Sequence, residues 1–234
     1  MEFVVAPDVF ARFPGLRVVV AVAAGLDNAV PRPVIEREWR AAWEAAAVAA
    51  APYGNAQSHP RVAPWRERFT AMGVSGKQFP SSIEALLRRA LKGGEPFRIN
   101  PLVDWYNAIS LRHTVPAGAF DLAAIAGPLE LRVTRASDMF TALDSAEPEA
   151  IPPGELAYAD GAAILTRHFV WRQAKTGLVS ATTRDLILLS EVLGAVGQTV
   201  ADAVLADFLD GLRAHFGIAG TGAVVSAEQP VFRW

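Results

Sequence analysis

Two groups of polar residues, each set among apolar neighbours, are the strongest candidates for chemistry in this sequence. In the first, polar residues recur at intervals of four and three, so in a helix they share one face: Asn100, Asp104, Asn107 and Ser110. Such a stripe is compatible with a water-facing surface, with a brace for the turn before Ala119, or with the lining of a cleft. Spacing alone leaves these alternatives open.

The second group is the run Trp171-Arg172-Gln173. In an extended strand, Trp171 and Gln173 point to one side and Arg172 to the other. A guanidinium pairs with carboxylates or phosphates, and an aromatic face stacks on a base or ring. The run therefore favours recognition of a nucleotide or an acidic group, and it is equally compatible with an ordinary surface pair between strands.

Several common active sites are excluded. The chain contains no cysteine, which removes disulfides, thiolate nucleophiles and Cys-based zinc sites. No two of its four histidines have the i, i+4 spacing of a helical metal site. There is no G-x-S-x-G elbow, no Walker A loop and no G-x-G-x-x-G after a strand. We therefore expect neither a metal nor a cofactor.

The charge balance limits the class of partner. With 234 residues and a net charge of −2, the chain lacks the basic excess that supports binding along a nucleic acid, so we expect no DNA partner. One group of basic residues is compatible with a shallow contact to one RNA end. The same residues are also typical of a solvated helix surface: Arg61, Arg66, Arg68, Lys77, Arg88, Arg89 and Lys92. No apolar run is long enough to cross a bilayer, and we expect a cytoplasmic protein without a membrane partner.

Hydrophobic periodicity and turn residues predict the elements that position these groups. Helices are expected at residues 34–50, 60–71, 82–91, 101–111 and 199–216, with Asn100 as the N-cap of the fourth. Strands are expected at residues 16–23, 129–135, 155–159, 162–166, 169–173 and 186–189. Residues 223–234 read as a docking strand or a loose tail. Segregation of helices and strands predicts an α+β fold.

A family resemblance rests on motifs in a fixed order. Residues 99–107 and 115–121 resemble the N-x-V-V-D-x-T-N and Q-P-x-H-A-F-D segments of phenylalanyl-tRNA synthetase β chains. Further similarities follow at residues 131–135, 140–144, 156–160 and 182–188, so the resemblance covers about residues 60–195. The segment 79–89 and the run Trp171-Arg172-Gln173 are more similar to freestanding proteins of the same B3/B4 editing-domain group.

The resemblance implies a single domain over residues 1–234, with a three-layer α+β fold of mixed sheets and packed helices. In the synthetase, this domain binds the mischarged acceptor end and hydrolyses tyrosine wrongly esterified to phenylalanine tRNA. The expected partners are thus a tRNA acceptor end and its amino-acid moiety. Two positions depart from the family pattern. Gly118 occupies the position of the His in the synthetase motif, and Leu189 occupies the position of a Glu, although Glu191 follows two residues later.

Two functions are compatible with these observations. In the first, the chain hydrolyses a mischarged aminoacyl-tRNA ester in trans: the catalytic residues Arg172 and Gln173 hold the ribose or the carbonyl oxygen, and Trp171 stacks on a ring. The substrate-binding residues are then completed by Asn100, Asp104, Asn107, Ser110 and Thr182. In the second, the same cleft is a non-catalytic module that holds a tRNA end, a nucleotide or an amino acid. The near-neutral charge and the missing His favour the second function, whereas the resemblance and the polar cluster favour the first.

Overall fold

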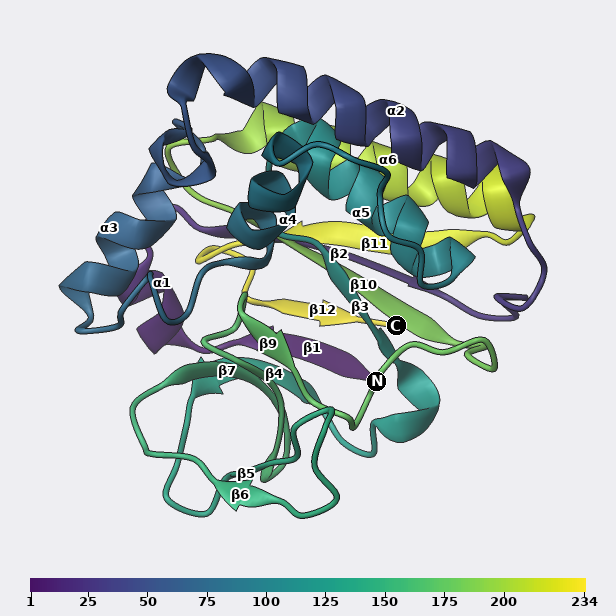
Figure 1. Cartoon of the computed structure of the whole chain (residues 1–234). Helices are drawn as coiled ribbons and strands as arrows, with labels where there is room; N and C mark the ends of the chain where they lie inside the picture. Colours follow the sequence, from purple (N-terminus) through teal and green to yellow (C-terminus); the bar gives the residue numbers. More distant parts are fainter.

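The computed structural model describes residues 1–234 and contains two sheets with helices on one side (Figure 1). The smaller sheet is antiparallel and has the order β11 (Gly220–Val225), β2 (Arg17–Ala23), β10 (Leu186–Val192) and β3 (Gly118–Asp121). The expected strand at residues 16–23 is therefore confirmed within one residue. The expected strand at 186–189 continues to Val192.

The larger sheet mixes parallel and antiparallel pairs. Its order is β12 (Val231–Arg233), β1 (Glu2–Val5), β4 (Leu129–Val133), β7 (Leu156–Asp160), β8 (Ala163–Arg167), β5 (Met139–Phe140) and β6 (Glu149–Ala150), and β9 (Arg172–Gln173) also pairs with β8. The C-terminal residues form docking strands rather than a loose tail, since β11 pairs with β2 and β12 with β1.

The helices are α1 (Pro7–Arg12), α2 (Pro33–Ala50), α3 (Ala63–Ala71), α4 (Ser82–Leu91), α5 (Pro101–His113) and α6 (Gln198–Phe216). Three short 3-10 turns lie at Ala51–Tyr53, Ala56–Ser58 and Leu122–Ala124. The expected helix at 60–71 begins only at Ala63, because residues 60–62 form a turn and Pro64 occupies the first turn of the helix. No helix combines the length and the apolar character needed to span a membrane.

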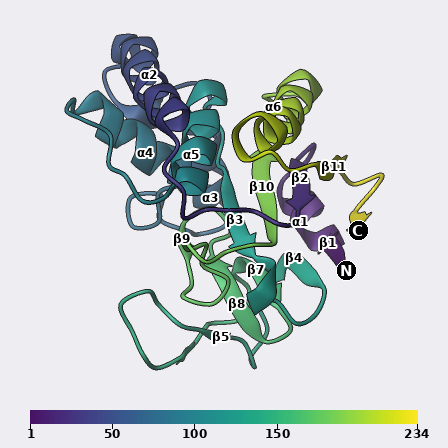
Figure 2. The ribbon, with the colours of Figure 1, turned by 90° about the vertical axis from the view of Figure 1, so that its right-hand side faces the viewer.

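The smaller sheet is the middle of three layers (Figure 2). On one face, alternate residues of β2 and β10 pack with α5 and α6 in one apolar cluster, which includes Val19 and Leu188. On the other face, Val20 and Leu189 pack in a second cluster with residues of the larger sheet. Burial of both faces explains the continuous apolar runs of these strands. The α+β prediction with three layers is confirmed.

One predicted strand is wrong over most of its length. Residues 168–171 form the turn of the β8–β9 hairpin, and only Arg172 and Gln173 are extended. His168 and Phe169 have φ values of 42° and 34°, which are unusual for residues other than glycine. The chain reverses direction here without the Gly or Asn that normally marks such a turn, so the apolar run read as one strand.

Candidate functional site

A pocket of about 430 Å³ opens beside β3, the edge strand of the smaller sheet. Its walls come from α5, the β8–β9 hairpin and the start of β3, and it extends inward to β7 and β10. Four of the predicted site residues line it: Asn107, Trp171, Arg172 and Gln173. The fold thus brings together two segments that are more than sixty residues apart in the chain.

The other members of the polar stripe lie outside the lining and bond to nearby groups. The Asn100 side chain accepts a hydrogen bond from the Val103 amide at 3.0 Å, as expected of an N-cap. Asp104 is buried and accepts from the Ile99 amide at 3.0 Å. Burial raises the pKa of Asp104, although the Ile99 amide and the charge of a nearby arginine act in the opposite direction.

Ser110 and Thr182 also have local partners. The Ser110 hydroxyl donates to the Val115 carbonyl at 2.5 Å, so Ser110 braces the turn that leads to Ala119. This is one of the alternatives that spacing left open. Thr182 lies in the exposed loop before β10, where its hydroxyl is 2.9 Å from that of Ser180.

The tip of the β8–β9 hairpin is fixed at both ends. The Val170 carbonyl accepts a 2.7 Å hydrogen bond from the amide of Ser82, the first residue of α4. The Glu155 carboxylate accepts from the His168 amide at 2.7 Å and from Arg167 at 2.9 Å. These contacts hold the strained turn and present its aromatic residues to the pocket.

Trp171 is supported by an aromatic cluster. Its ring meets Phe79 edge-on with centroids 4.6 Å apart, and His168 packs on Phe79 at 4.1 Å. Burial lowers the pKa of His168, so its imidazole is neutral at pH 7. A ring held in this way offers an ordered stacking surface at low entropic cost.

Arg172 and Gln173 differ in how much of each side chain is free. Arg172 is partly exposed and pairs with the exposed Asp144 at 2.8 Å, a contact that solvent weakens. The Gln173 amide nitrogen donates to the Ala119 carbonyl at 3.1 Å, which ties the hairpin to β3. The Arg172 guanidinium can therefore turn toward a ligand more readily than the Gln173 amide can.

Glu191 is a buried carboxylate in this lining that was not among the predicted site residues. It receives a short hydrogen bond from the Tyr158 hydroxyl. Burial raises the pKa of Glu191 to about 7, because the loss of hydration outweighs the opposing effect of the Tyr158 hydrogen bond. The available sequence signal was weak: Glu191 lies two residues after the family's Glu position at Leu189 and so shares its face of the strand.

Gly118 lines the pocket without a side chain. It pairs with Leu189 in the sheet, and a Cβ added to it would meet no atom within 4 Å. The buried Ser190 hydroxyl donates to the Pro116 carbonyl at 2.6 Å and fixes the segment that leads into β3. The position that carries His in the synthetase motif is thus open space in this pocket.

Comparison with known proteins places the pocket within a recognised domain. The sequence pattern of the B3/4 domain family matches residues 65–201, which is more than half of the chain. The chain belongs to the B3/4 domain family. Every residue that lines the pocket falls inside this matched range.

Two of the proteins to which the chain is similar are synthetase chains. The chain is 36% identical to the phenylalanine–tRNA ligase beta subunit of Shewanella oneidensis over 90 residues, which are 38% of this chain and 11% of that protein. A crystallised N-terminal fragment of the phenylalanyl-tRNA synthetase beta-subunit from Pyrococcus horikoshii aligns with a TM-score of 0.45 and 11% identity, over 95% of this chain and 53% of the fragment. The chain thus spans only part of either relative.

Three of the seven basic residues that were predicted to contact an RNA end form polar contacts within the B3/4 domain. Arg66 and Arg88 both pair with the buried Glu84, and Arg61 donates to the His113 carbonyl. Arg89 differs, because it lies over the Phe97 ring at 5.0 Å and lines the pocket. Arg89 and Arg172 are the two cationic side chains of the lining.

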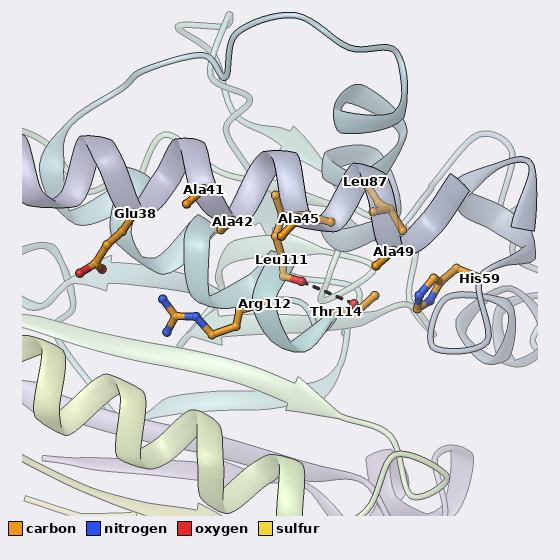
Figure 3. Close-up of a pocket in the computed structure, with 11 residues that line it drawn as sticks. Glu38, Ala41, Ala42, Ala45, Ala49, His59, Leu87, Leu111, Arg112 and Thr114 are labelled. Atoms are coloured by element: carbon orange, nitrogen blue, oxygen red, sulfur yellow. Dashed lines mark hydrogen bonds between the residues drawn. The ribbon is translucent and has the colours of Figure 1, made fainter. Parts of the chain in front are cut away.

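A second cavity of about 390 Å³ lies along α2 and contains none of the predicted site residues (Figure 3). Alanines of α2 form one wall, and Leu111, Arg112 and Thr114 contribute from α5 and the residue that follows it. The Thr114 hydroxyl donates to the Leu111 carbonyl at 3.5 Å. Most of the lining is apolar, and its charged side chains, Glu38 and Arg112, already have side-chain partners.

Proposed function

We propose that this B3/4 domain hydrolyses the ester bond of a mischarged aminoacyl-tRNA in trans and that the pocket beside β3 receives the acceptor end. One observation carries the proposal: Asn107, Trp171, Arg172 and Gln173, predicted separately from sequence, line one pocket inside the B3/4 match. Its volume of about 430 Å³ is in the range of small-molecule sites. The similarity to a phenylalanine–tRNA ligase beta subunit supports the choice of substrate class.

The proposed reaction needs positioning more than a dedicated nucleophile. An aminoacyl ester is already activated, and donors aimed at the developing oxyanion contribute several kcal/mol of transition-state stabilisation, roughly 3–4 per group. Arg172 is assigned to the carbonyl oxygen or the ribose, with Gln173 beside it, and Asn107 to the substrate amino group. Trp171 supplies the stacking surface for the terminal base.

The distribution of charge agrees with a contact limited to one RNA end. Arg89 and Arg172 supply positive charge at the pocket, while the net charge of the whole chain is −2. Few phosphate contacts imply a weak salt dependence of binding. A ligand that enters only as the terminal nucleotide with its amino acid needs no more positive charge than these two arginines supply.

The test is deacylation of a panel of mischarged tRNAs by the purified protein, with Arg172→Ala as the site variant. We expect hydrolysis of one or a few charged species and a loss of at least about tenfold in the variant. Arg213→Ala is the matched control, because Arg213 also forms an exposed ion pair, with Asp210, on α6. An equal rate in Arg172→Ala and wild type would remove Arg172 from the site.

A binding module without catalysis is the second candidate, and two observations favour it. Gly118 replaces the family's His, and the amide nitrogen of Gln173 already donates to a backbone carbonyl. If no charged tRNA is hydrolysed, a thermal-shift screen with free amino acids and adenosine measures binding, since a ligand of the folded state raises the apparent stability. A shift without hydrolysis would establish this second function.

A further inference from the structure

Glu191 is the only acidic side chain among the residues that line the pocket. It lies on β10 at the inner end of the pocket, and 5% of its surface is exposed. A buried carboxylate without a cationic partner is unfavourable for folding, so its presence at this position calls for a functional explanation.

We propose that the Glu191 carboxylate is the general base that activates the hydrolytic water, and that the Tyr158 hydroxyl positions it. This inference rests on the proposed function and adds to it the group that handles the proton. Arg172, Gln173 and Asn107 bind and orient in that scheme, and none of them is a base at neutral pH.

The contacts of Glu191 suit this role. One carboxylate oxygen, Oε1, accepts the Tyr158 hydrogen bond, which fixes the orientation of the group. In this scheme the second oxygen contacts the water. Gly118, which pairs with the neighbouring Leu189, lines the same pocket without a side chain, and a Cβ added there would meet no atom within 4 Å. The hydrogen bond from Ser190 to Pro116 keeps the segment before Gly118 in place.

The proton balance of the reaction is simple. Water attacks the ester carbonyl carbon while its proton passes to Glu191, which gives a tetrahedral intermediate. The intermediate collapses by breaking the bond between the carbonyl carbon and the ribose oxygen. Glu191 returns the proton to that oxygen, so the products are the free amino acid and a tRNA with its hydroxyl restored. No oxidant, metal or further reactant is consumed.

The protonation state of Glu191 agrees with this chemistry, since a base is most effective when its pKa is near the working pH. The other charged or titratable side chains of the lining are Tyr106 of α5, Tyr158 of β7, Arg89 of α4 and Arg172 of β9. Burial raises the pKa of both tyrosines above the usual tyrosine value, so neither of them titrates near pH 7. The α-amino group of the substrate also titrates near neutral pH, so only the part of the pH–rate profile that Glu191→Gln loses is assigned to Glu191.

The experiment compares kcat and KM across pH for wild type, Glu191→Gln and Tyr158→Phe on the most rapidly hydrolysed tRNA, after subtraction of uncatalysed hydrolysis. We expect Glu191→Gln to lose about a hundredfold in kcat with KM within about twofold, and to lose the rise in rate through pH 7. Tyr158→Phe removes a hydrogen bond that favours the ionised carboxylate, so the midpoint of its pH–rate profile moves to higher pH. Glu130→Gln, a strand glutamate outside the pocket, is the control and keeps the wild-type profile.

Each outcome decides the inference. If wild type and Glu191→Gln hydrolyse the ester equally, Glu191 is not the base, while the proposed function stands. If wild type hydrolyses no charged tRNA, the proposed function and this inference both fail. Should Glu191→Gln not fold, Tyr158→Phe decides: an unmoved midpoint overturns the role of Glu191, and an upward shift supports it.

Discussion

The Tyr158 hydroxyl on β7 donates a hydrogen bond to the Glu191 carboxylate on β10, and this contact joins the two sheets. Both residues are buried within the apolar layer between the sheets. A hydrogen bond to an ionised group is strong, but one such bond does not replace the hydration of a carboxylate. The folded protein therefore holds a carboxyl group that binds a proton far more readily than it would in water.

This relationship predicts how stability depends on pH. The pKa of Glu191 is raised from 4.5 to about 7 on folding, so between these values the folded state binds more protons than the unfolded state. The contribution of Glu191 to stability is thus most favourable below about pH 4.5, falls as pH rises toward 7, and is constant above. We expect Glu191→Gln to gain on the order of 3 kcal/mol relative to wild type between pH 4.5 and 8. Urea unfolding of both proteins across this range measures the gain, and a constant difference would contradict it.

Gly211 in α6 predicts an effect opposite to the usual one. Gly→Ala in a helix interior ordinarily stabilises a protein by about 1 kcal/mol. Here an added Cβ would lie 2.4 Å from the Trp105 ring, so the ring or the helix must shift. We expect Gly211→Ala to lower the free energy of unfolding by roughly 1–3 kcal/mol in denaturant titrations.

The control for this prediction is the reverse change at Ala214, an exposed residue of the same helix. Ala214→Gly should cost about 1 kcal/mol from helix propensity alone. Pairing Gly211→Ala with Trp105→Phe removes part of the clash, so the two effects should not add. A stabilised Gly211→Ala protein would contradict the close contact between α6 and the Trp105 ring of α5.

Regular elements with strong local signals could be predicted from sequence. The helices α4 and α5 begin where Ser81 and Asn100 cap them, and each side chain accepts from the amide three residues on. Strand β2 was evident from its continuous apolar run. By contrast, β1 and β3 are short and depend on partners distant in the chain, so local periodicity did not reveal them.

The site was only partly predictable for a related reason. Spacing shows that Asn107 and Ser110 share a face of α5, but only the packing shows that Asn107 meets the pocket while Ser110 braces a turn. Glu191 sits in the run Leu186–Val192, which reads as a buried strand, and its partner Tyr158 is 33 residues away. Two residues that meet across two sheets have no fixed spacing in the chain, so a single sequence does not reveal that they are in contact.

A buried ion pair in the larger sheet gives the last prediction. Arg132 donates two hydrogen bonds to Asp138, at 2.6 and 3.0 Å, and both side chains are shielded from solvent. Burial by itself raises the pKa of Asp138. The hydrogen bonds from Arg132 and from the Arg135 amide lower the pKa by more than burial raises it, so the net pKa is below the usual 3.8. The stability that Asp138 contributes is therefore present above about pH 4 and is lost as pH falls through its folded pKa.

Removing Asp138 leaves the Arg132 guanidinium buried without its carboxylate. We expect Asp138→Ala to cost about 3–5 kcal/mol of unfolding free energy at neutral pH, measured by urea titration. Asp144→Ala is the matched control, because Asp144 also pairs with an arginine but is 80% exposed, and it should cost less than about 1 kcal/mol. Equal losses in the two variants would mean that burial adds nothing to the pair. Replacing Arg132 and Asp138 together with Met and Leu should recover much of the loss, since no unpaired charge then remains in the sheet.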